Sequence, residues 1–301
     1  MKIGVIVPQG WTGEFKGWQP TDAWSRTRDV ARQAEALGFE SIWLFDHFHT
    51  VPRPSLEITF EAFTTLAALA AETRRVRLGH VVLCAAYRNP ALTTKMISTL
   101  DAISAGRMEL GLGAGWKRDE WRAYGYGFPP ARERLAILKD QLEIARAMME
   151  DDHASYAGEH HSIDGAISEP KPVQKPRIPI MVGGNGPNVT WRLAAKYADE
   201  LNVDGLTPAE VAEALPVIRS RCEEIGRDPA SLPVSAHIWW EQLSATGQSR
   251  VDLVGAYREL GISRLIGMIR ETVTSAEALA QWADDARAGG AELVDSHALG
   301  A

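Results

Sequence analysis

Two polar side chains at the end of an apolar run are the first candidates for chemistry. The run SIWLFD at 41–46 is followed by His47, so Asp46 and His47 stand side by side. A carboxylate can orient an imidazole or set its charge, and an imidazole exchanges protons close to neutral pH. We interpret His47 as a proton donor or stabiliser in a catalytic site. The alternative is a pair of capping groups.

His47 and His49 could also hold a metal ion, because residues two apart lie on one face of a strand. A metal site at a barrel mouth needs further ligands from other strand ends, whereas His80 and His237 lie inside predicted strands. We therefore predict that the chain holds no metal. A metal-dependent barrel hydrolase is kept as an alternative from another class of enzyme.

Two glycine clusters mark places where a ligand could approach the backbone. Gly111, Gly113 and Gly115 alternate at the end of an apolar run, just before Trp116. They do not match the dinucleotide fingerprint GxGxxG, because Trp116 occupies the place of its third glycine. Glycines admit a flat ligand since no Cβ stands in the way, although a tightly packed strand would also need them.

The second cluster, GGNGPN at 183–188, precedes a predicted helix that starts with Pro187. Free N–H groups and the macrodipole at a helix start favour an anion. Gly183, Gly184 and Gly186 are therefore candidates for an anion site, with an ordinary connecting loop as the alternative.

These candidates lie at the ends of predicted strands, because short β-branched runs alternate with stretches of helical period. Strands are expected at 3–7, 41–46, 76–84, 107–113, 178–184, 200–205, 234–240 and 263–269. Eight strand–helix units predict an α/β protein of one domain, 1–301, forming a (β/α)₈ TIM barrel with an irregular insertion near 151–177. A doubly wound open sheet is the structural alternative. In a barrel, the active site lies at the carboxyl ends of the strands.

Composition limits the possible partners. The 301 residues are 45% hydrophobic and 24% charged, with a net charge of −7, so binding to nucleic acid has little support. Two cysteines, Cys84 and Cys222, indicate a reducing, cytoplasmic setting. No run is long enough to span a membrane, and the first ten residues are typical of a strand rather than a signal peptide.

Three segments, in order, resemble the bacterial-luciferase-like oxidoreductases, and within them the branch that uses the deazaflavin coenzyme F420. They are SIWLFDHF, the stretch from VRLGHVVLC to WRAYG, and PIMVGGNGPNVTWRLAAKYADELN. The resemblance covers residues 1 to about 205. It implies a deazaflavin in the barrel mouth, with hydride transfer between its C5 and a small organic substrate.

The resemblance also implies individual roles. It assigns cofactor contacts to Asp46, Val82, Cys84, Ala114, Gly115, Asp119, Gly183, Gly184 and Gly186. It further implies a non-proline cis peptide at Val81–Val82. Trp116 stands where members that oxidise sugar phosphates carry a glutamate, so we expect a reductase or an alcohol-type oxidoreductase. Trp116 and Trp240, both at strand ends, are the expected substrate contacts.

An FMN-dependent luciferase-like monooxygenase is the alternative within the same fold, and a cofactor-binding module without turnover is a third possibility. The expected partner is a small-molecule substrate, and the expected assembly is a homodimer.

Overall fold

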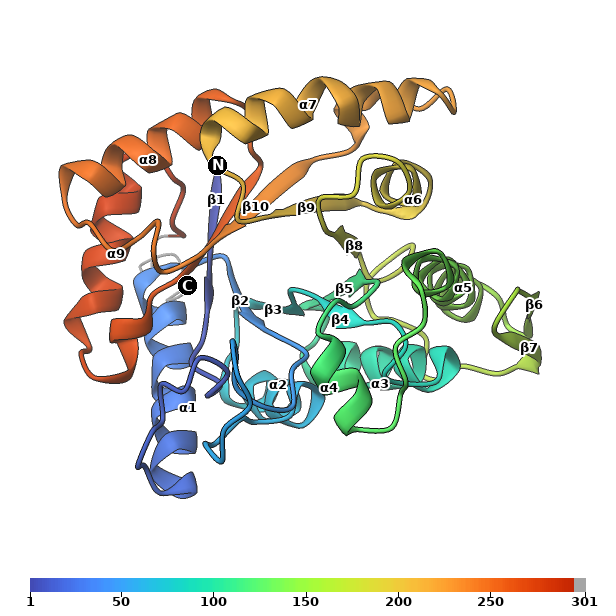
Figure 1. Cartoon of the computed structure of the whole chain (residues 1–301), viewed down its shortest axis with the longest axis horizontal. Helices are drawn as coiled ribbons and strands as arrows, with labels where there is room; N and C mark the ends of the chain where they lie inside the picture. Colours follow the sequence, from blue (N-terminus) through green and yellow to red (C-terminus); the bar gives the residue numbers. More distant parts are fainter. Residues whose placement is uncertain (295–301) are drawn as a thin grey trace.

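The computed structural model describes residues 1–294, which form a closed parallel β-barrel surrounded by helices (Figure 1). The strand order is β3-β2-β1-β11-β10-β9-β8-β5-β4, and a further pairing of β3 with β5 closes the ring. The first and last strands lie side by side, with Lys2 opposite Arg264. The predicted (β/α)₈ barrel is confirmed, and the open sheet is excluded.

The elements follow the predicted order closely. The barrel strands are β1 (Lys2–Ile6), β2 (Ser41–Leu44), β3 (Arg77–His80), β4 (Leu83–Cys84), β5 (Met108–Gly113), β8 (Ile180–Gly183), β9 (Glu200–Asp204), β10 (Val234–Ile238) and β11 (Arg264–Met268). The helices are α1 (Pro20–Leu37), α2 (Ala62–Glu72), α3 (Pro90–Ile103), α4 (Arg118–Ala123), α5 (Ala131–Glu150), α6 (Thr190–Tyr197), α7 (Pro208–Glu223), α8 (Gln248–Glu259) and α9 (Glu277–Ala288). Among residues 1–294, none of the helices is long and apolar enough to cross a membrane.

The third barrel strand is broken in the middle. β3 and β4 both pair with β5, but four steps from Gly79 to Leu83 lie opposite three steps from Glu109 to Leu112. One extra residue therefore bulges out of the strand, which interrupts the ladder. The expected cis peptide between Val81 and Val82 is present in this bulge.

Two predictions about local structure were wrong. The insertion at 151–177 is not wholly irregular, since β6 (Ala154–Ala157) and β7 (Ser162–Ala166) form an antiparallel hairpin that packs on α5 outside the barrel (Figure 1). The helix expected to start at Pro187 begins at Thr190 instead. The hairpin strands are short and mostly polar, which hides their period, and the start of α6 differs from the prediction by three residues.

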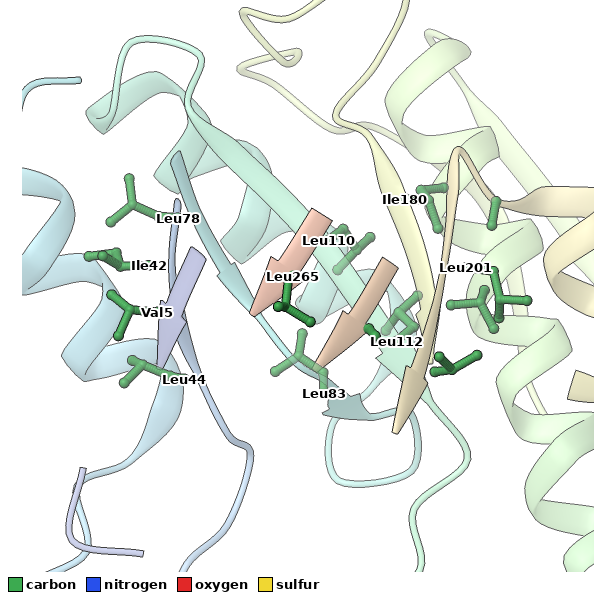
Figure 2. Packing of buried hydrophobic residues seen from close by; sticks show 14 of the residues in the cluster. Val5, Ile42, Leu44, Leu78, Leu83, Leu110, Leu112, Ile180, Leu201 and Leu265 are labelled. Atoms are coloured by element: carbon green, nitrogen blue, oxygen red, sulfur yellow. The ribbon is translucent and has the colours of Figure 1, made fainter. Parts of the chain in front are cut away.

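The buried apolar residues form layers on the two sides of the barrel strands. The larger layer contains strand residues such as Val5, Ile42 and Leu110, which lie between the strands and the helices (Figure 2). A smaller cluster inside the barrel contains Ile6 and Trp43, together with other inward residues. This inner cluster lies below the cavity that opens at the carboxyl ends of the strands, and several of its members, such as Phe45 and Val81, line that cavity.

Candidate active site

A cavity of about 360 Å³ opens at the carboxyl ends of the barrel strands. Its volume falls in the range typical of sites for small ligands. Nine of the twelve predicted site residues line it: Asp46, His47, Val82, Cys84, Ala114, Gly115, Trp116, Gly183 and Gly184. Asp119, Gly186 and Trp240 are not among its lining residues. The cavity lies where a TIM barrel places its active site.

His47 is held by a carboxylate that sequence reasoning missed. Glu120 Oε2 lies 2.8 Å from His47 Nδ1, and the Glu120 side chain is fully buried. The hydroxyl of Tyr87 donates to the same oxygen at 3.1 Å. Burial raises the pKa of Glu120, but the hydrogen bond and charge of His47, with donors from Phe48 N–H and Tyr87, outweigh burial and lower it. The ionised carboxylate therefore fixes a proton on Nδ1, and Nε2 is left without a partner among residues 1–294.

Asp46 does not orient His47, contrary to the sequence-based interpretation. Its two oxygens accept from Arg88 at 2.8 and 2.9 Å, and one also accepts from the backbone N–H of Cys84 at 2.9 Å. Asp46 is 3% exposed, and its oxygens are engaged by these three donors. Its role in the structure is to tie the end of β2 to β4 and to the start of α3.

The glycines of β5 and Gly183 of β8 leave space for the side chain of Val82 and the backbone of His80 rather than directly for a ligand. A Cβ on Gly113 would lie 2.5 Å from Val82 Cγ2, and one on Gly183 would lie 2.7 Å from Val82 Cγ1. A Cβ on Gly111 would lie 1.9 Å from the carbonyl oxygen of His80. Side chains at these positions would collide with the bulge of the third strand. Gly113 and Gly183 therefore accommodate the side chain of Val82, and we call these two glycines the Val82 seat. Val82 itself lines the cavity.

Gly115 and Gly184 differ from Gly111, Gly113 and Gly183 because their backbones have a positive φ. At Gly115, where φ is 74°, a Cβ would meet the sulfur of Cys84 at 2.5 Å. At Gly184, where φ is 125°, a Cβ would meet only Thr190 Cγ2, at 3.6 Å. Gly184 therefore leaves open space at the cavity wall, which suits the close approach of a ligand. Burial raises the pKa of the Cys84 thiol, so this side chain is a neutral contact and not a thiolate nucleophile.

Aromatic rings form one wall of the cavity. The Trp11 ring stacks on the His47 ring with centroids 4.8 Å apart, and the Trp239 ring stacks on Phe45 at 5.5 Å. Trp116 meets His47 edge-on at 5.9 Å and is 63% exposed at the rim. The Nε1 atom of Trp11 is buried without a hydrogen-bond partner among the described residues. Apolar walls with a few unpaired polar atoms fit a flat polycyclic ring with polar edges.

Three residues predicted to contact a ligand do not line the cavity. Trp240 packs beneath the Arg270 guanidinium at 5.1 Å, whereas its neighbour Trp239 lines the cavity. Asp119 pairs with Lys117 at 2.8 Å. A Cβ on Gly186 would lie 2.7 Å from Thr190 Oγ1, so this glycine shapes the loop before α6. The position of Trp239 follows from strand alternation, because residues 235, 237 and 239 share the inward side of the strand.

The arrangement of the histidines does not favour a metal. Nδ1 of His47 faces Glu120, while Nδ1 of His49 faces the carbonyl oxygen of Thr50 at 3.1 Å. Within the described part of the chain, no group of three or more suitable side chains could hold a metal ion.

Comparisons with known proteins agree on the fold and point to a family. A family model described as luciferase-like monooxygenase matches residues 1–298. An F420-dependent glucose-6-phosphate dehydrogenase of Kineococcus radiotolerans is 35% identical over 174 residues, which are 56% of this chain and 48% of that protein. The chain thus matches about half the length of this curated relative.

Two solved structures share the fold at low sequence identity. An F420-dependent secondary alcohol dehydrogenase in complex with an F420-acetone adduct superposes with a TM-score of 0.80 at 20% identity, over 96% of this chain and 98% of that one. The oxygenating constituent of 3,6-diketocamphane monooxygenase from Pseudomonas putida, in complex with FMN, gives 0.73 at 16% identity, over 98% and 99%. Both similarities extend over nearly the whole barrel.

Proposed function

The chain belongs to the luciferase-like monooxygenase family, and from that premise we propose that it is an F420-dependent oxidoreductase acting on a small, apolar alcohol or ketone. The observation that carries this proposal is the His47–Glu120 pair at the wall of an apolar cavity, with Nε2 of His47 free. F420 dependence is supported by the activity named for the Kineococcus relative. A homodimer in the cytoplasm remains our expectation.

The residues that would hold the deazaflavin are those around the Val82 seat. The ring would rest against Val82, with Ala114, Gly115 and Cys84 along its edge. Its phosphate-bearing tail would lie at Gly184 and the start of α6, where the helix macrodipole favours negative charge. The cofactor, when bound, supplies the hydride or accepts it.

His47 handles the proton in this proposal. In the direction of oxidation, Nε2 takes the hydroxyl proton of the substrate, and in reduction it returns a proton to the carbonyl oxygen. Glu120 stabilises the positive charge that His47 gains, since its carboxylate lies 2.8 Å from Nδ1 and is withdrawn from solvent. Trp11 limits rotation of the imidazole by stacking on its face.

The substrate is proposed to be uncharged because the cavity offers no free cation to a phosphate group. Lys117 is the only lysine or arginine among its described lining residues. Its Nζ donates to the carbonyl of Pro52 at 3.0 Å and to Asp119 at 2.8 Å. Trp116 and Trp239 instead supply apolar surface. A sugar phosphate, the substrate named for the Kineococcus relative, therefore suits this cavity poorly.

We predict that the protein binds F420 more tightly than FMN. Isothermal titration calorimetry with each cofactor, under the same buffer and salt, tests this choice. Tighter binding of FMN, together with oxygen uptake by the reduced complex, would support the monooxygenase alternative, since reduced flavins react with oxygen and reduced deazaflavins hardly do.

A further inference from the structure

A second hydrogen-bonded chain of residues lies at the cavity, apart from His47 and Glu120. Asn202 and Asp204 alternate along β9, while Ser235, His237 and Trp239 alternate along β10 and just beyond it. Alternate residues of a barrel strand point to the same side, so these five face the barrel interior. All of them except Ser235 line the cavity.

Four hydrogen bonds connect these residues. The Asn202 amide donates to Ser235 Oγ at 2.9 Å, which leaves its Oδ1 atom facing His237 Nδ1 at 2.7 Å. His237 Nε2 lies 2.9 Å from Asp204 Oδ1. The same carboxylate oxygen accepts from the indole N–H of Trp239 at 3.0 Å. Both ring nitrogens of His237 thus face oxygen atoms, so the imidazole links Asn202 to Asp204.

The carboxylate of Asp204 contacts two side chains of this chain, those of His237 and Trp239. Burial raises the pKa of the Asp204 carboxyl, but the hydrogen bond and charge of His237 and the hydrogen bond from Trp239 outweigh burial and lower it. The other charged groups around the cavity have partners of their own, in the pairs His47–Glu120, Asp46–Arg88 and Lys117–Asp119. The Asp204 side chain, 46% exposed at the rim, is left to His237 and Trp239.

The Trp239 ring is fixed from three directions. It stacks on Phe45 with an interplanar angle of 14°, and it contacts Trp11 at a centroid distance of 5.5 Å. Gly205 lies against its edge, since a Cβ there would be 2.7 Å from the indole Nε1. Of these restraints, the bond to Asp204 is the one that is a directional hydrogen bond to the indole N–H.

We propose that Asp204, paired with His237, is a positioning residue that holds Trp239 as a rigid apolar wall for the substrate. The class of substrate rests on the proposed function, but the positioning does not. If the bond to Asp204 is lost, the indole can rotate and the wall becomes less complementary to an apolar ligand.

Two nearly isosteric variants of Asp204 distinguish a role in holding Trp239 from a role in the stability of the fold alone. Asp204→Leu removes the acceptor for Trp239, whereas Asp204→Asn keeps an oxygen that can accept from the indole. Glu241→Leu, at an exposed residue near the same rim, is the matched control. The first readout is the solvent exchange of the Trp239 indole N–H by NMR, with the resonance assigned by its absence in Trp239→Phe. The second is fluorescence titration with N-phenyl-1-naphthylamine, a neutral aromatic probe.

We expect Asp204→Leu to speed the exchange of the indole proton and to weaken binding of the probe about fivefold, the effect of one lost hydrogen bond. Asp204→Asn should restore both within about twofold, and Glu241→Leu should change neither. In turnover of a secondary alcohol with F420, Asp204→Leu should raise KM more than it lowers kcat.

Unchanged exchange and probe affinity in Asp204→Leu would overturn the proposal, and so would an Asp204→Asn variant as impaired as Asp204→Leu. A protein that binds the probe as expected but turns over no alcohol with F420 would refute the proposed function while leaving the positioning role supported.

Discussion

The two ring nitrogens of His47 differ in their surroundings, because Nδ1 faces Glu120 while Nε2 has no hydrogen-bond partner among residues 1–294. Nδ1 is bound to Glu120, whose other oxygen accepts from the backbone N–H of Phe48 at 2.6 Å. The carboxylate is thus pinned on two sides and cannot turn away from the imidazole. In this geometry, the free Nε2 is the atom that can exchange a proton with a ligand in the cavity.

At this scale we predict that His47→Ala lowers kcat by about 10²–10⁴, the usual loss when acid–base assistance is removed. Glu120→Gln keeps the size of the side chain but removes its charge, so it should lower kcat by about 10–100-fold. Steady-state kinetics test both, with the exposed Glu133→Gln as control. If both variants raised only KM, with kcat unchanged, His47 would be a binding contact rather than a proton carrier.

Residue type and strand position were enough to predict that His47 lies at the cavity, but not that Glu120 is its partner. Glu120 lies on α4, whose six residues are too short to show a helical period. The nearby carboxylate Asp46 was chosen because it is adjacent in sequence, and only the folded chain shows that Arg88 occupies it. The sequence also did not show that Trp239 rather than Trp240 lines the cavity, because the register at the end of β10 decides which ring faces inward.

At the scale of elements, the seat for Val82 links three neighbouring strands. The bulge between β3 and β4 projects Val82 towards the cavity, and the absence of side chains at Gly113 of β5 and Gly183 of β8 accommodates it. The alternation of strands and helices predicted the barrel and the place of these glycines. The role of the glycines could not be predicted, because the atoms they accommodate come from another strand.

Gly113→Ala is therefore expected to destabilise the protein by about 1–3 kcal/mol through overpacking against Val82. It should also weaken cofactor binding, since the displaced Val82 lines the cavity. Val82→Ala in the same chain removes the colliding methyl groups, so the double variant should regain stability relative to Gly113→Ala alone. Urea denaturation of the two single variants and the double variant measures this coupling. Strictly additive losses would show that the two residues do not share the seat.

For the molecule as a whole, two buried groups give the stability opposite dependences on pH. His80 is fully buried with neither ring nitrogen hydrogen-bonded, and burial lowers its pKa to about 4. Burial raises the pKa of Glu200 in spite of the nearby Arg264. The folded state therefore binds fewer protons than the unfolded chain at His80 and more at Glu200.

As pH falls from about 6.5 to 4, His80 becomes protonated in the unfolded chain but stays neutral in the folded protein. This difference should lower the free energy of unfolding by about 3 kcal/mol. His80→Leu should remove that loss, and the exposed His153→Gln should not. The pKa of Glu200 is raised in the folded state, so its protonation stabilises the folded protein as pH falls towards the usual pKa of a glutamate. Glu200→Gln removes this contribution and should make the free energy of unfolding fall more steeply with decreasing pH. Urea midpoints measured between pH 4 and 7 test these signs. An unchanged pH slope in His80→Leu would contradict the assignment.

The pairing of β1 with β11 has a consequence for the synthesis of this protein on the ribosome. β1 is translated long before β11, and Lys2 lies opposite Arg264, so the ring of strands cannot close until β11 has been translated. During that interval the hydrogen-bonding edges of β1 and of the growing sheet remain open to other chains. Nascent copies on one messenger RNA are thus at risk of pairing with each other, and co-expression of a holdase chaperone should raise the soluble yield.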